Sequence, residues 1–248
     1  MSATRGGSKG KGAEAEPSWS LEDIAGMIDH SLLNPALTQE ALEAGIKIAL
    51  EHKVASVCIL PYYLRRCAEL LKGSGVRAST TIGFPHGGQV TAVKVAEAGR
   101  AIDHGGEELD AVVNISRVLS ADWDYIRTEL KGIIELSHSR GAKVKVIFEN
   151  CYLRDEHKVM LCEICGELRA DWVKTSTGFG PSGATIPDLE LMRKHSPAWV
   201  QVKAAGGVRD LDTVLAVRAI GVTRFGCTRT VEVLAEAKRR LDGARRGK

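Results

Sequence analysis

Short apolar segments bordered by turn residues alternate with segments of helical periodicity along almost the whole chain. We expect strands at 27–30, 54–60, 77–82, 108–114, 143–149, 171–176, 199–204 and 221–226. We expect helices at 37–52, 62–72, 89–104, 121–139, 154–168, 186–195, 210–219 and 229–242, with a short additional helix at about 20–26. This alternation predicts an α/β protein built on a parallel sheet.

The number of these units narrows the prediction to one architecture. Eight strand–helix units over about 220 residues match a single (β/α)8 TIM barrel in number and length. A doubly wound sheet is the competing arrangement, but it rarely needs eight such regular units in one domain. No change in composition marks a second domain. We therefore expect a disordered tail over residues 1–18 and a barrel domain over residues 19–248.

The composition is that of an ordinary globular protein and excludes several functions. Hydrophobic residues make up 44% of the chain and charged residues 26%, while a net charge of +3 is too small to indicate a nucleic-acid partner. No apolar run reaches the length of a membrane span. The first 18 residues are rich in Gly, Ser, Ala and Lys and have no apolar core, so they do not form a secretory signal.

The six cysteines, at positions 58, 67, 151, 162, 165 and 227, are expected to be reduced thiols. Without an export signal, a reducing compartment is expected, which places the protein in the cytoplasm. Cys162 and Cys165 form a CxxC pair, but they fall inside a helical pattern with no second ligand pair at zinc-like spacing. We interpret them as structural residues.

Two lysines lie in apolar strands, just before glycine-bearing loops. Lys174 belongs to the segment DWVKTSTG at 171–178, and Lys203 belongs to WVQVKAAGG at 199–207. Burying an ammonium group is costly, so a lysine in such a position tends to lose its proton and become a nucleophile. If the two lysines are close together, each lowers the pKa of the other. The pattern favours an enzyme that forms a Schiff base.

The alternation of side chains along each strand indicates which residues point into the barrel. Glu149 is expected on this inner face at a strand end, and Trp199 is expected on it beside Lys203. Catalytic residues of such barrels lie at the carboxyl ends of the strands, although a buried ion network is an alternative explanation for charges in the lumen. The charged residues expected on the inner face are Asp110, Lys145, Lys174 and Lys203.

The glycine-rich loops suggest two kinds of ligand. Gly178, Gly180 and Gly183 form a GxGxxG pattern, but Pro181 interrupts the expected helix start. A dinucleotide fingerprint also needs an acidic residue in the next strand, where the chain has Lys203. Dinucleotide binding is therefore disfavoured.

The loops after the seventh and eighth strands suggest a phosphate site. Gly206 and Gly207 follow the seventh strand, and the run Gly226-Cys227-Thr228 follows the eighth. Barrel enzymes often hold a phosphate between these loops, against backbone N–H groups and a helix N-terminus. Arg229 would add positive charge, and simple tight turns are the alternative explanation.

Five ordered motifs connect this chain to a known family. They are IDHSLLNP at 28–35, ELDAVVNI at 108–115, VKVIFENCYL at 144–153, VKTSTGFGPSGAT at 173–185 and VKAAGGVR at 202–209. With these motifs the chain resembles the deoxyribose-phosphate aldolases, class I lyases, from about Met27 to the last helix. The resemblance implies reversible cleavage of 2-deoxy-D-ribose 5-phosphate to D-glyceraldehyde 3-phosphate and acetaldehyde, in the catabolism of deoxyribonucleotides.

The resemblance also implies residue roles and partners. Lys174 would form the Schiff base, Lys203 would perturb it and help to move protons, and Asp110 would be the carboxylate of the proton relay. No cofactor, metal, nucleic acid or membrane is expected, and a homodimer is compatible with a sequence that does not fix the oligomeric state. The residues expected to bind substrate are Cys58, Lys145, Ser31, Thr177, Gly178, Gly206, Gly207, Gly226 and Thr228.

The chain departs from the family pattern at three places. Ser31 and Asn34 stand where the family motif reads IDHTLLKP. The family often has two serines in the last phosphate loop, whereas the run here is Gly226-Cys227-Thr228-Arg229. Some members also carry a tyrosine at the extreme C-terminus, whereas the last tyrosine here is Tyr152. A proton step assigned to that tyrosine would use water or the Asp110–Lys203 pair.

Two other functions are compatible with the same barrel. In the first, Glu149 is the general base of an isomerase that acts on a phosphorylated substrate. In the second, the barrel binds a phosphorylated sugar without turning it over. Trapping of an imine would separate the aldolase from the isomerase, and binding without turnover would indicate the non-catalytic protein.

Overall fold

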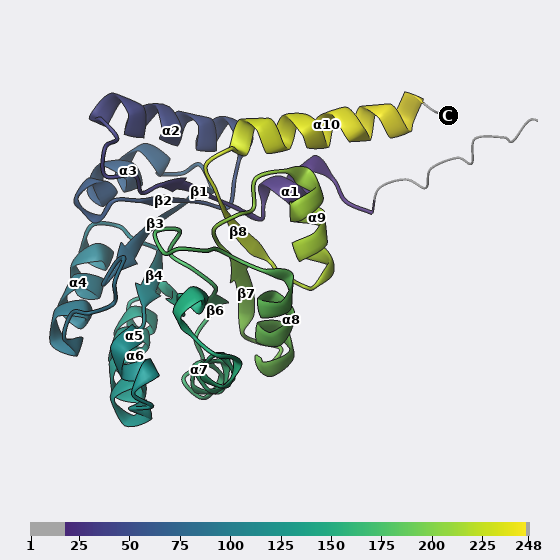
Figure 1. Cartoon of the computed structure of the whole chain (residues 1–248). Helices are drawn as coiled ribbons and strands as arrows, with labels where there is room; N and C mark the ends of the chain where they lie inside the picture. The colour runs from purple at the N-terminus through teal and green to yellow at the C-terminus, as the bar shows by residue number, and fades with distance from the viewer. Residues whose placement is uncertain (1–17, 247–248) are drawn as a thin grey trace, which may run out of the picture.

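The computed structural model describes residues 18–246, apart from the side chain of Arg246, and within them the chain forms a closed barrel (Figure 1). All neighbouring strands are parallel and pair in chain order, and β1 closes the barrel by pairing with β8. The expected TIM barrel is therefore confirmed. The expected disordered tail, residues 1–18, lies outside the described residues except for Ser18.

Each of the eight predicted strands is present, although most are shorter than expected. The strands are β1 (Ile28–Leu32), β2 (Ser56–Ile59), β3 (Arg77–Ile82), β4 (Glu108–Val112), β5 (Lys143–Ile147), β6 (Trp172–Lys174), β7 (Gln201–Ala204) and β8 (Arg224–Cys227). The prediction is two residues too long at the carboxyl ends of β4, β5 and β6, and two or three residues too long at the amino ends of β2, β7 and β8.

One long helix follows each strand and returns the chain to the start of the next, which confirms the predicted alternation. These helices are α2 (Gln39–His52), α3 (Leu64–Leu71), α4 (Thr91–Asp103), α6 (Trp123–Ser139), α7 (Asp155–Glu167), α8 (Ile186–His195), α9 (Leu211–Ala219) and α10 (Thr230–Arg246). The predicted short helix is α1 (Leu21–Ala25). Three short elements were not predicted, namely α5 (Ile115–Leu119), η1 (Pro61–Tyr63) and η2 (Asn150–Tyr152).

The first outer helix illustrates why these segments are helical. Thr38 caps α2 by accepting a hydrogen bond from the backbone N–H of Ala41, at 3.3 Å. Leu42, Ile46 and Ala49 follow at helical spacing and are buried. This apolar side of the helix packs against the hydrophobic core.

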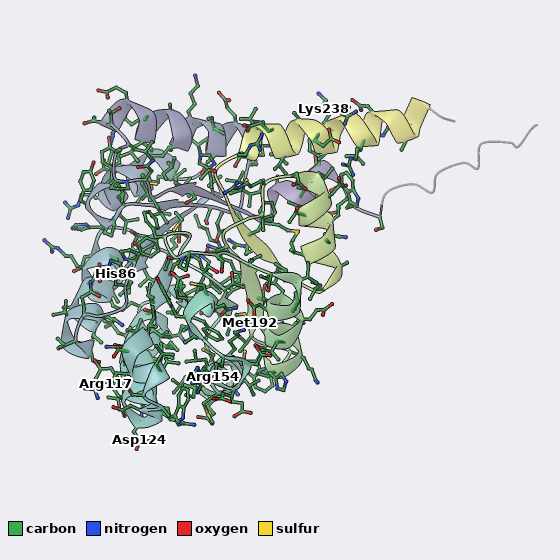
Figure 2. The ribbon with its side chains drawn as sticks, in the orientation of Figure 1. His86, Arg117, Asp124, Arg154, Met192 and Lys238 are labelled. Atoms are coloured by element: carbon green, nitrogen blue, oxygen red, sulfur yellow. The ribbon has the colours of Figure 1, made fainter. Side chains whose placement is uncertain are left out.

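The molecule has two buried zones of different chemistry. Between the sheet and the helices lies an apolar layer, to which β5 contributes Val144 and Val146. The lumen of the barrel contains the charged side chains described below. Charged residues such as Arg117, Asp124, Arg154 and Lys238 are exposed on the outside (Figure 2). Across residues 18–246, none of the helices combines the length and the apolar character needed to span a bilayer.

Trp199 and the CxxC pair lie outside the barrel lumen. Trp199 was expected in the lumen, which is wrong: it precedes β7, is 59% exposed and stacks under the guanidinium of Arg169. The alternation rule does not apply to it, because the residue lies outside the regular strand. Cys162 and Cys165 are buried in the hydrophobic core on α7, as expected for structural residues.

Candidate active site

The carboxylate of Asp110 joins three lysines inside the barrel. Its Oδ2 accepts hydrogen bonds from Nζ of Lys174 at 2.7 Å and from Nζ of Lys203 at 2.8 Å. Its Oδ1 accepts from Nζ of Lys145 at 2.9 Å. All four side chains are at most 4% exposed. The inner-face assignment of these four residues is therefore confirmed, and the two sequence-predicted lysines contact the same oxygen atom.

Backbone register explains how these side chains meet. Lys174 is the last residue of β6, and it is paired in register with Lys203 on β7. Asp110 on β4 is in register with Lys145 on β5. Residues in register on neighbouring strands of a closed barrel point into the same layer of the lumen. The spacing within each strand thus places every long side chain within reach of the central carboxylate.

Three further charged residues complete this network and were not predicted. Asp29 accepts from Lys203 at 2.5 Å and from Arg224 at 2.5 Å, and Glu108 accepts from Lys145 at 2.6 Å. Arg224 also reaches Glu108 at 2.9 Å. The signal for Glu108 was present in the sequence, since it lies two residues before Asp110 and shares its side of β4.

The charges in this network almost balance. Asp29, Glu108 and Asp110 supply three carboxylates, whereas the cationic side chains number four, apart from the half-exposed Arg77 at the edge. A closed, dry lumen disfavours an uncompensated charge. The network becomes neutral if one cation loses its proton. Those cationic side chains are Lys145, Lys174, Lys203 and Arg224.

The surroundings of Lys174 and Lys203 shift the pKa values of the two amines in opposite directions. Burial lowers the pKa of Lys174, and although Asp110 opposes this, the charge of Lys203 lowers the pKa further. Burial alone would also lower the pKa of Lys203, but the carboxylates of Asp110 and Asp29 raise it above its usual value. The prediction that each lysine lowers the pKa of the other is therefore wrong for Lys203, because it lies between two carboxylates.

Asp110 stays ionised in this setting. Burial alone would raise the pKa of Asp110, but the ammonium groups around it hold that pKa well below the usual range. Lys145 is the opposite case, because three carboxylates raise its pKa well above normal despite its burial. Among these three lysines, the pKa is lowered for Lys174 and raised for Lys145 and Lys203.

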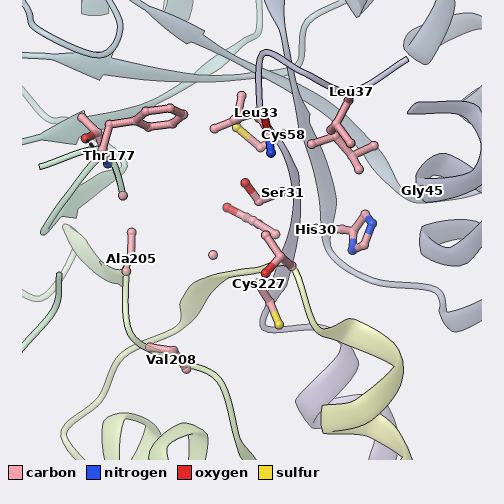
Figure 3. Close-up of a pocket in the computed structure, with 18 of the residues that line it drawn as sticks. His30, Ser31, Leu33, Leu37, Gly45, Cys58, Thr177, Ala205, Val208 and Cys227 are labelled. Carbon is pink, nitrogen blue, oxygen red and sulfur yellow. Dashed lines mark hydrogen bonds between the residues drawn. The ribbon is translucent and has the colours of Figure 1, made fainter. Parts of the chain in front are cut away.

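A cavity of about 900 Å³ adjoins this network, and residues such as Ser31, Cys58 and Thr177 lie around it (Figure 3). Lys174 and Lys203 both line the cavity, whereas Asp110 and Lys145 do not. Lys145 was expected to contact substrate, but it is not among the residues that line the cavity and instead pairs with Asp29, Glu108 and Asp110. The other residues expected to bind substrate all line the cavity, namely Ser31, Cys58, Thr177, Gly178, Gly206, Gly207, Gly226 and Thr228.

One side of the cavity is apolar and lies outside the barrel lumen, against α2. Leu33, Leu37, Ala41 and Ile48 form this side. His30 also lines the cavity, and its Nδ1 is 2.8 Å from the hydroxyl of Thr230 at the start of α10. The cavity is thus amphipathic, with the amines at one end and an apolar wall at the other.

The polar side of the cavity exposes backbone donors. Within residues 18–246, the N–H groups of Gly178, Gly206, Gly207 and Thr228 donate to no acceptor. Arg209 also lines the cavity and forms no ion pair in the described part of the chain. Free N–H groups and an unpaired guanidinium favour an anion. Arg229, which we expected to supply positive charge, is absent from the cavity wall. Its Nε lies 3.5 Å from Oε1 of Glu232.

The GxGxxG pattern has a packing explanation in this fold. A Cβ atom on Gly183 would lie 2.4 Å from the carbonyl oxygen of Gly206, so the two loops can cross only if residue 183 is glycine. The backbone N–H of Ala184 donates to the carbonyl oxygens of Ala205 and Gly206, at 3.0 and 2.9 Å. These glycines bring the loop after β6 against the loop after β7.

Comparisons with known proteins agree with this arrangement. A model of the DeoC/LacD family aldolases matches residues 24–226. A deoxyribose-phosphate aldolase of Rhodopirellula baltica is 63% identical over 223 residues, which cover 90% of this chain and 92% of that protein. Another, of Caldanaerobacter subterraneus, is 43% identical over 221 residues, covering 89% of this chain and 96% of the relative.

A solved structure of another deoxyribose-phosphate aldolase has a similar fold. The deoxyribose-phosphate aldolase of Aeropyrum pernix superimposes with a TM-score of 0.82 at 31% identity, over 88% of this chain and 92% of that one. That structure is described as tetrameric, and a homodimer stays a prediction for this chain.

The protein is an α/β-barrel lyase that acts on carbon–carbon bonds. This class follows from the barrel fold, the lysines in the lumen and the matches to known aldolases. Within that class, the chain belongs to the DeoC/LacD family of aldolases.

Proposed function

We propose that this aldolase reversibly cleaves 2-deoxy-D-ribose 5-phosphate to D-glyceraldehyde 3-phosphate and acetaldehyde through a Schiff base on Lys174. The observation that carries the proposal is the contact of Lys174 and Lys203 with one oxygen of Asp110 beside the cavity. A lysine kept neutral by burial and a cationic neighbour is an amine that can attack a carbonyl carbon.

In the cleavage direction, Nζ of Lys174 adds to the aldehyde carbon C1 of the open-chain sugar. Loss of water then gives a protonated imine. A base removes the proton of the C3 hydroxyl, the C2–C3 bond breaks, and its electron pair moves into the iminium to give an enamine. Glyceraldehyde 3-phosphate leaves with its new C3 carbonyl. Protonation of the enamine at C2 and hydrolysis release acetaldehyde and restore the amine.

The proton transfers are assigned to Asp110 and Lys203, acting through water. Asp110 is ionised and hydrogen-bonded to both amines, so it can exchange a proton with either one. Lys203 keeps its proton because two carboxylates raise its pKa. A charged lysine is suited to donate a proton to the carbinolamine hydroxyl, which then leaves as water, or to C2 of the enamine.

The isomerase alternative, with Glu149 as general base, is not favoured. Both oxygens of the Glu149 carboxylate accept hydrogen bonds from Thr177, one from its N–H at 3.1 Å and one from its hydroxyl. Glu149 is also absent from the residues that line the cavity. A general base must be within reach of the proton that it removes.

Trapping of the imine tests the proposed mechanism. Incubation with acetaldehyde followed by borohydride reduction is expected to add one ethyl group at Lys174, located by mass spectrometry of the peptides. The reason is that reduction of the imine makes the bond to Nζ permanent. A stable protein that is modified only at another lysine, or not at all, would refute the assignment.

Replacing Lys203 with leucine should move the acid limb of the kcat/KM profile to higher pH. The charge of Lys203 lowers the pKa of Lys174, and its removal also leaves Asp110 free to stabilise a protonated Lys174. Both effects raise the pKa of Lys174. The readout is the position of the acid limb, because the height of the profile also reflects lost proton transfer. An unmoved limb would contradict electrostatic coupling of the two amines.

The phosphate is assigned to the free N–H groups around Gly206 and Gly207, together with Arg209. Arg209→Ala is expected to raise KM for 2-deoxyribose 5-phosphate about tenfold, equivalent to about 1.4 kcal/mol for one charge-assisted contact, with kcat nearly unchanged. Steady-state kinetics checks this, with Arg229→Ala as the matched control that should leave KM unchanged. Equal effects of the two substitutions would contradict the assignment of Arg209.

We further propose a cytoplasmic location and a role in breaking down the sugar phosphate of deoxyribonucleotides. The location is supported by the six cysteines, all of which are free thiols. The catabolic role is supported by the likeness to the curated deoxyribose-phosphate aldolases.

A further inference from the structure

The carboxylate of Glu149 is buried without a cationic partner. The residue is 2% exposed, and within residues 18–246 no lysine, arginine or histidine pairs with it. Its hydrogen-bond partners are the backbone N–H and the hydroxyl of one residue, Thr177. Burying a carboxylate in this way is costly, so its contacts point to a role in holding Thr177.

The backbone at Glu149 is tied to the strand that carries the reactive lysine. Phe148 N donates to the carbonyl oxygen of Lys174 at 3.0 Å, and Asn150 N donates to that of Thr175 at 2.9 Å. Between them Glu149 has a left-handed conformation, with φ of 57°, which is uncommon for a residue with a side chain. This conformation turns the carboxylate toward the loop that follows β6.

The hydrogen bonds continue from the carboxylate into that loop. The hydroxyl of Thr177 donates to Glu149 and accepts a hydrogen bond from the backbone N–H of Phe179, at 3.0 Å. Gly178 lies between these two residues with φ of +89°. A Cβ on Gly180 would lie 3.2 Å from Cδ of Glu149, so the loop passes directly over the carboxylate. One acid group therefore fixes the turn formed by residues 177–179.

This turn forms part of the cavity wall. Thr177, Gly178 and Phe179 all line the cavity, and the free N–H of Gly178 belongs to the turn. The Phe179 ring packs edge to face against Phe84, with ring centres 5.4 Å apart. The rest of the loop meets the glycine loop after β7 through Ala184. The turn thus borders the backbone donors assigned to the phosphate.

We propose that Glu149 is a positioning residue for substrate affinity, which holds the 177–179 turn so that the Gly178 N–H faces the phosphate. The proposal rests on the proposed function, since it assumes a phosphorylated substrate. It assigns Glu149 no proton transfer. Loss of the carboxylate therefore weakens binding of a phosphorylated substrate more than it slows the chemical steps on Lys174.

The test compares Glu149→Gln, Thr177→Val and the double variant with the wild-type enzyme. Each is assayed with 2-deoxyribose 5-phosphate and with 2-deoxyribose, which lacks the phosphate. For each single variant we expect KM for the phosphorylated sugar to rise at least tenfold, while kcat/KM for 2-deoxyribose changes less than threefold. The double variant should be no worse than the worse single variant, because both substitutions remove the hydrogen bond from the Thr177 hydroxyl to the Glu149 carboxylate.

Asp171→Asn is the matched control. The Asp171 carboxylate also accepts a backbone N–H from a neighbouring strand, that of Val144 at 2.9 Å, but it precedes β6 at the end of the strand away from the cavity. This substitution is expected to leave KM for both substrates unchanged, even where it lowers the melting temperature. Circular dichroism is used to check that each variant is folded. If Glu149→Gln does not fold, the test uses Thr177→Val in its place.

Three results would overturn the proposal. They are an unchanged KM in folded single variants, equal losses with both substrates, and additive effects in the double variant, which would mean that Thr177 acts on substrate independently of Glu149. Failure of the proposed function is recognised separately. In that case the wild-type enzyme itself forms no borohydride-trapped adduct with acetaldehyde and does not cleave 2-deoxyribose 5-phosphate.

Discussion

Replacing Lys174 with arginine is expected to abolish turnover and leave the barrel folded. A guanidinium keeps its proton at any pH that the enzyme tolerates, so it cannot add to a carbonyl carbon. The guanidinium can still donate a hydrogen bond to Asp110. In the wild-type protein Asp110 accepts hydrogen bonds from Lys174 at 2.7 Å and from Lys203 at 2.8 Å. We expect kcat/KM to fall by at least about 1,000-fold, as when a covalent nucleophile is lost.

The measurement combines aldol cleavage kinetics with borohydride trapping and urea unfolding. Lys47→Arg serves as the control, because Lys47 is an exposed lysine of α2 with 78% of its side chain accessible. That control should retain full activity. Retention of more than a tenth of the wild-type activity by a folded Lys174→Arg protein would exclude Lys174 as the nucleophile.

Replacing Asp110 with asparagine is expected to remove both activity and much of the stability. Asp110 is fully buried and its carboxylate contacts the amines of three lysines, so the substitution leaves the charges of Lys145 and Lys203 uncompensated. Breaking a buried ion pair by removing one partner costs about 3–5 kcal/mol. Urea unfolding at pH 7 should detect a loss of this order, and turnover should fall with it because the proton relay is gone.

The pH dependence of this loss has a definite sign. The pKa of Asp110 in the folded protein is well below its unfolded value of about 3.9, so its stabilisation is fully present above that value. It disappears as the pH falls through the folded-state pKa. The difference in unfolding free energy between wild type and Asp110→Asn should therefore stay constant at about 3–5 kcal/mol from pH 6 to 8. Below about pH 4 this difference should shrink.

The exposed ion pair between Asp212 and Arg240 serves as the control for the buried Asp110. Asp212 pairs with Arg240 at 2.6 Å, but 77% of its side chain is accessible, so Asp212→Asn should change stability little. A folded Asp110→Asn protein with the unfolding free energy of the wild type would show that the carboxylate is not essential to the network. Full activity in that variant would remove Asp110 from the proton relay.

The elements of the barrel could be predicted because their signals are local. Apolar spacing along 37–52 identifies a helix, and α2 forms there from Gln39 to His52. Alternation along a strand also states which side chains share a face. Lys174, Lys203 and Asp110 could therefore be placed in the lumen without knowledge of any contact.

The partners of these residues could not be predicted, because they come from distant parts of the chain. Arg224 meets Asp29 across 195 positions, and Lys203 meets Asp110 across 93. Spacing within one strand carries no information on which strand lies opposite. The sign of the pKa shift at Lys203 depends on Asp29 in this way, and the sequence-based expectation for it was wrong.

The pattern of residues was thus sufficient to determine the barrel, its eight strand–helix units and the inward direction of the reactive lysines, since each follows from the periodicity of a short segment. Closure of the sheet determined which lysine has its pKa lowered, that Arg209 and not Arg229 reaches the cavity, and that Glu149 accepts hydrogen bonds from Thr177. These properties depend on distances between side chains of different strands and loops. Such distances exist only once the ring of strands has closed.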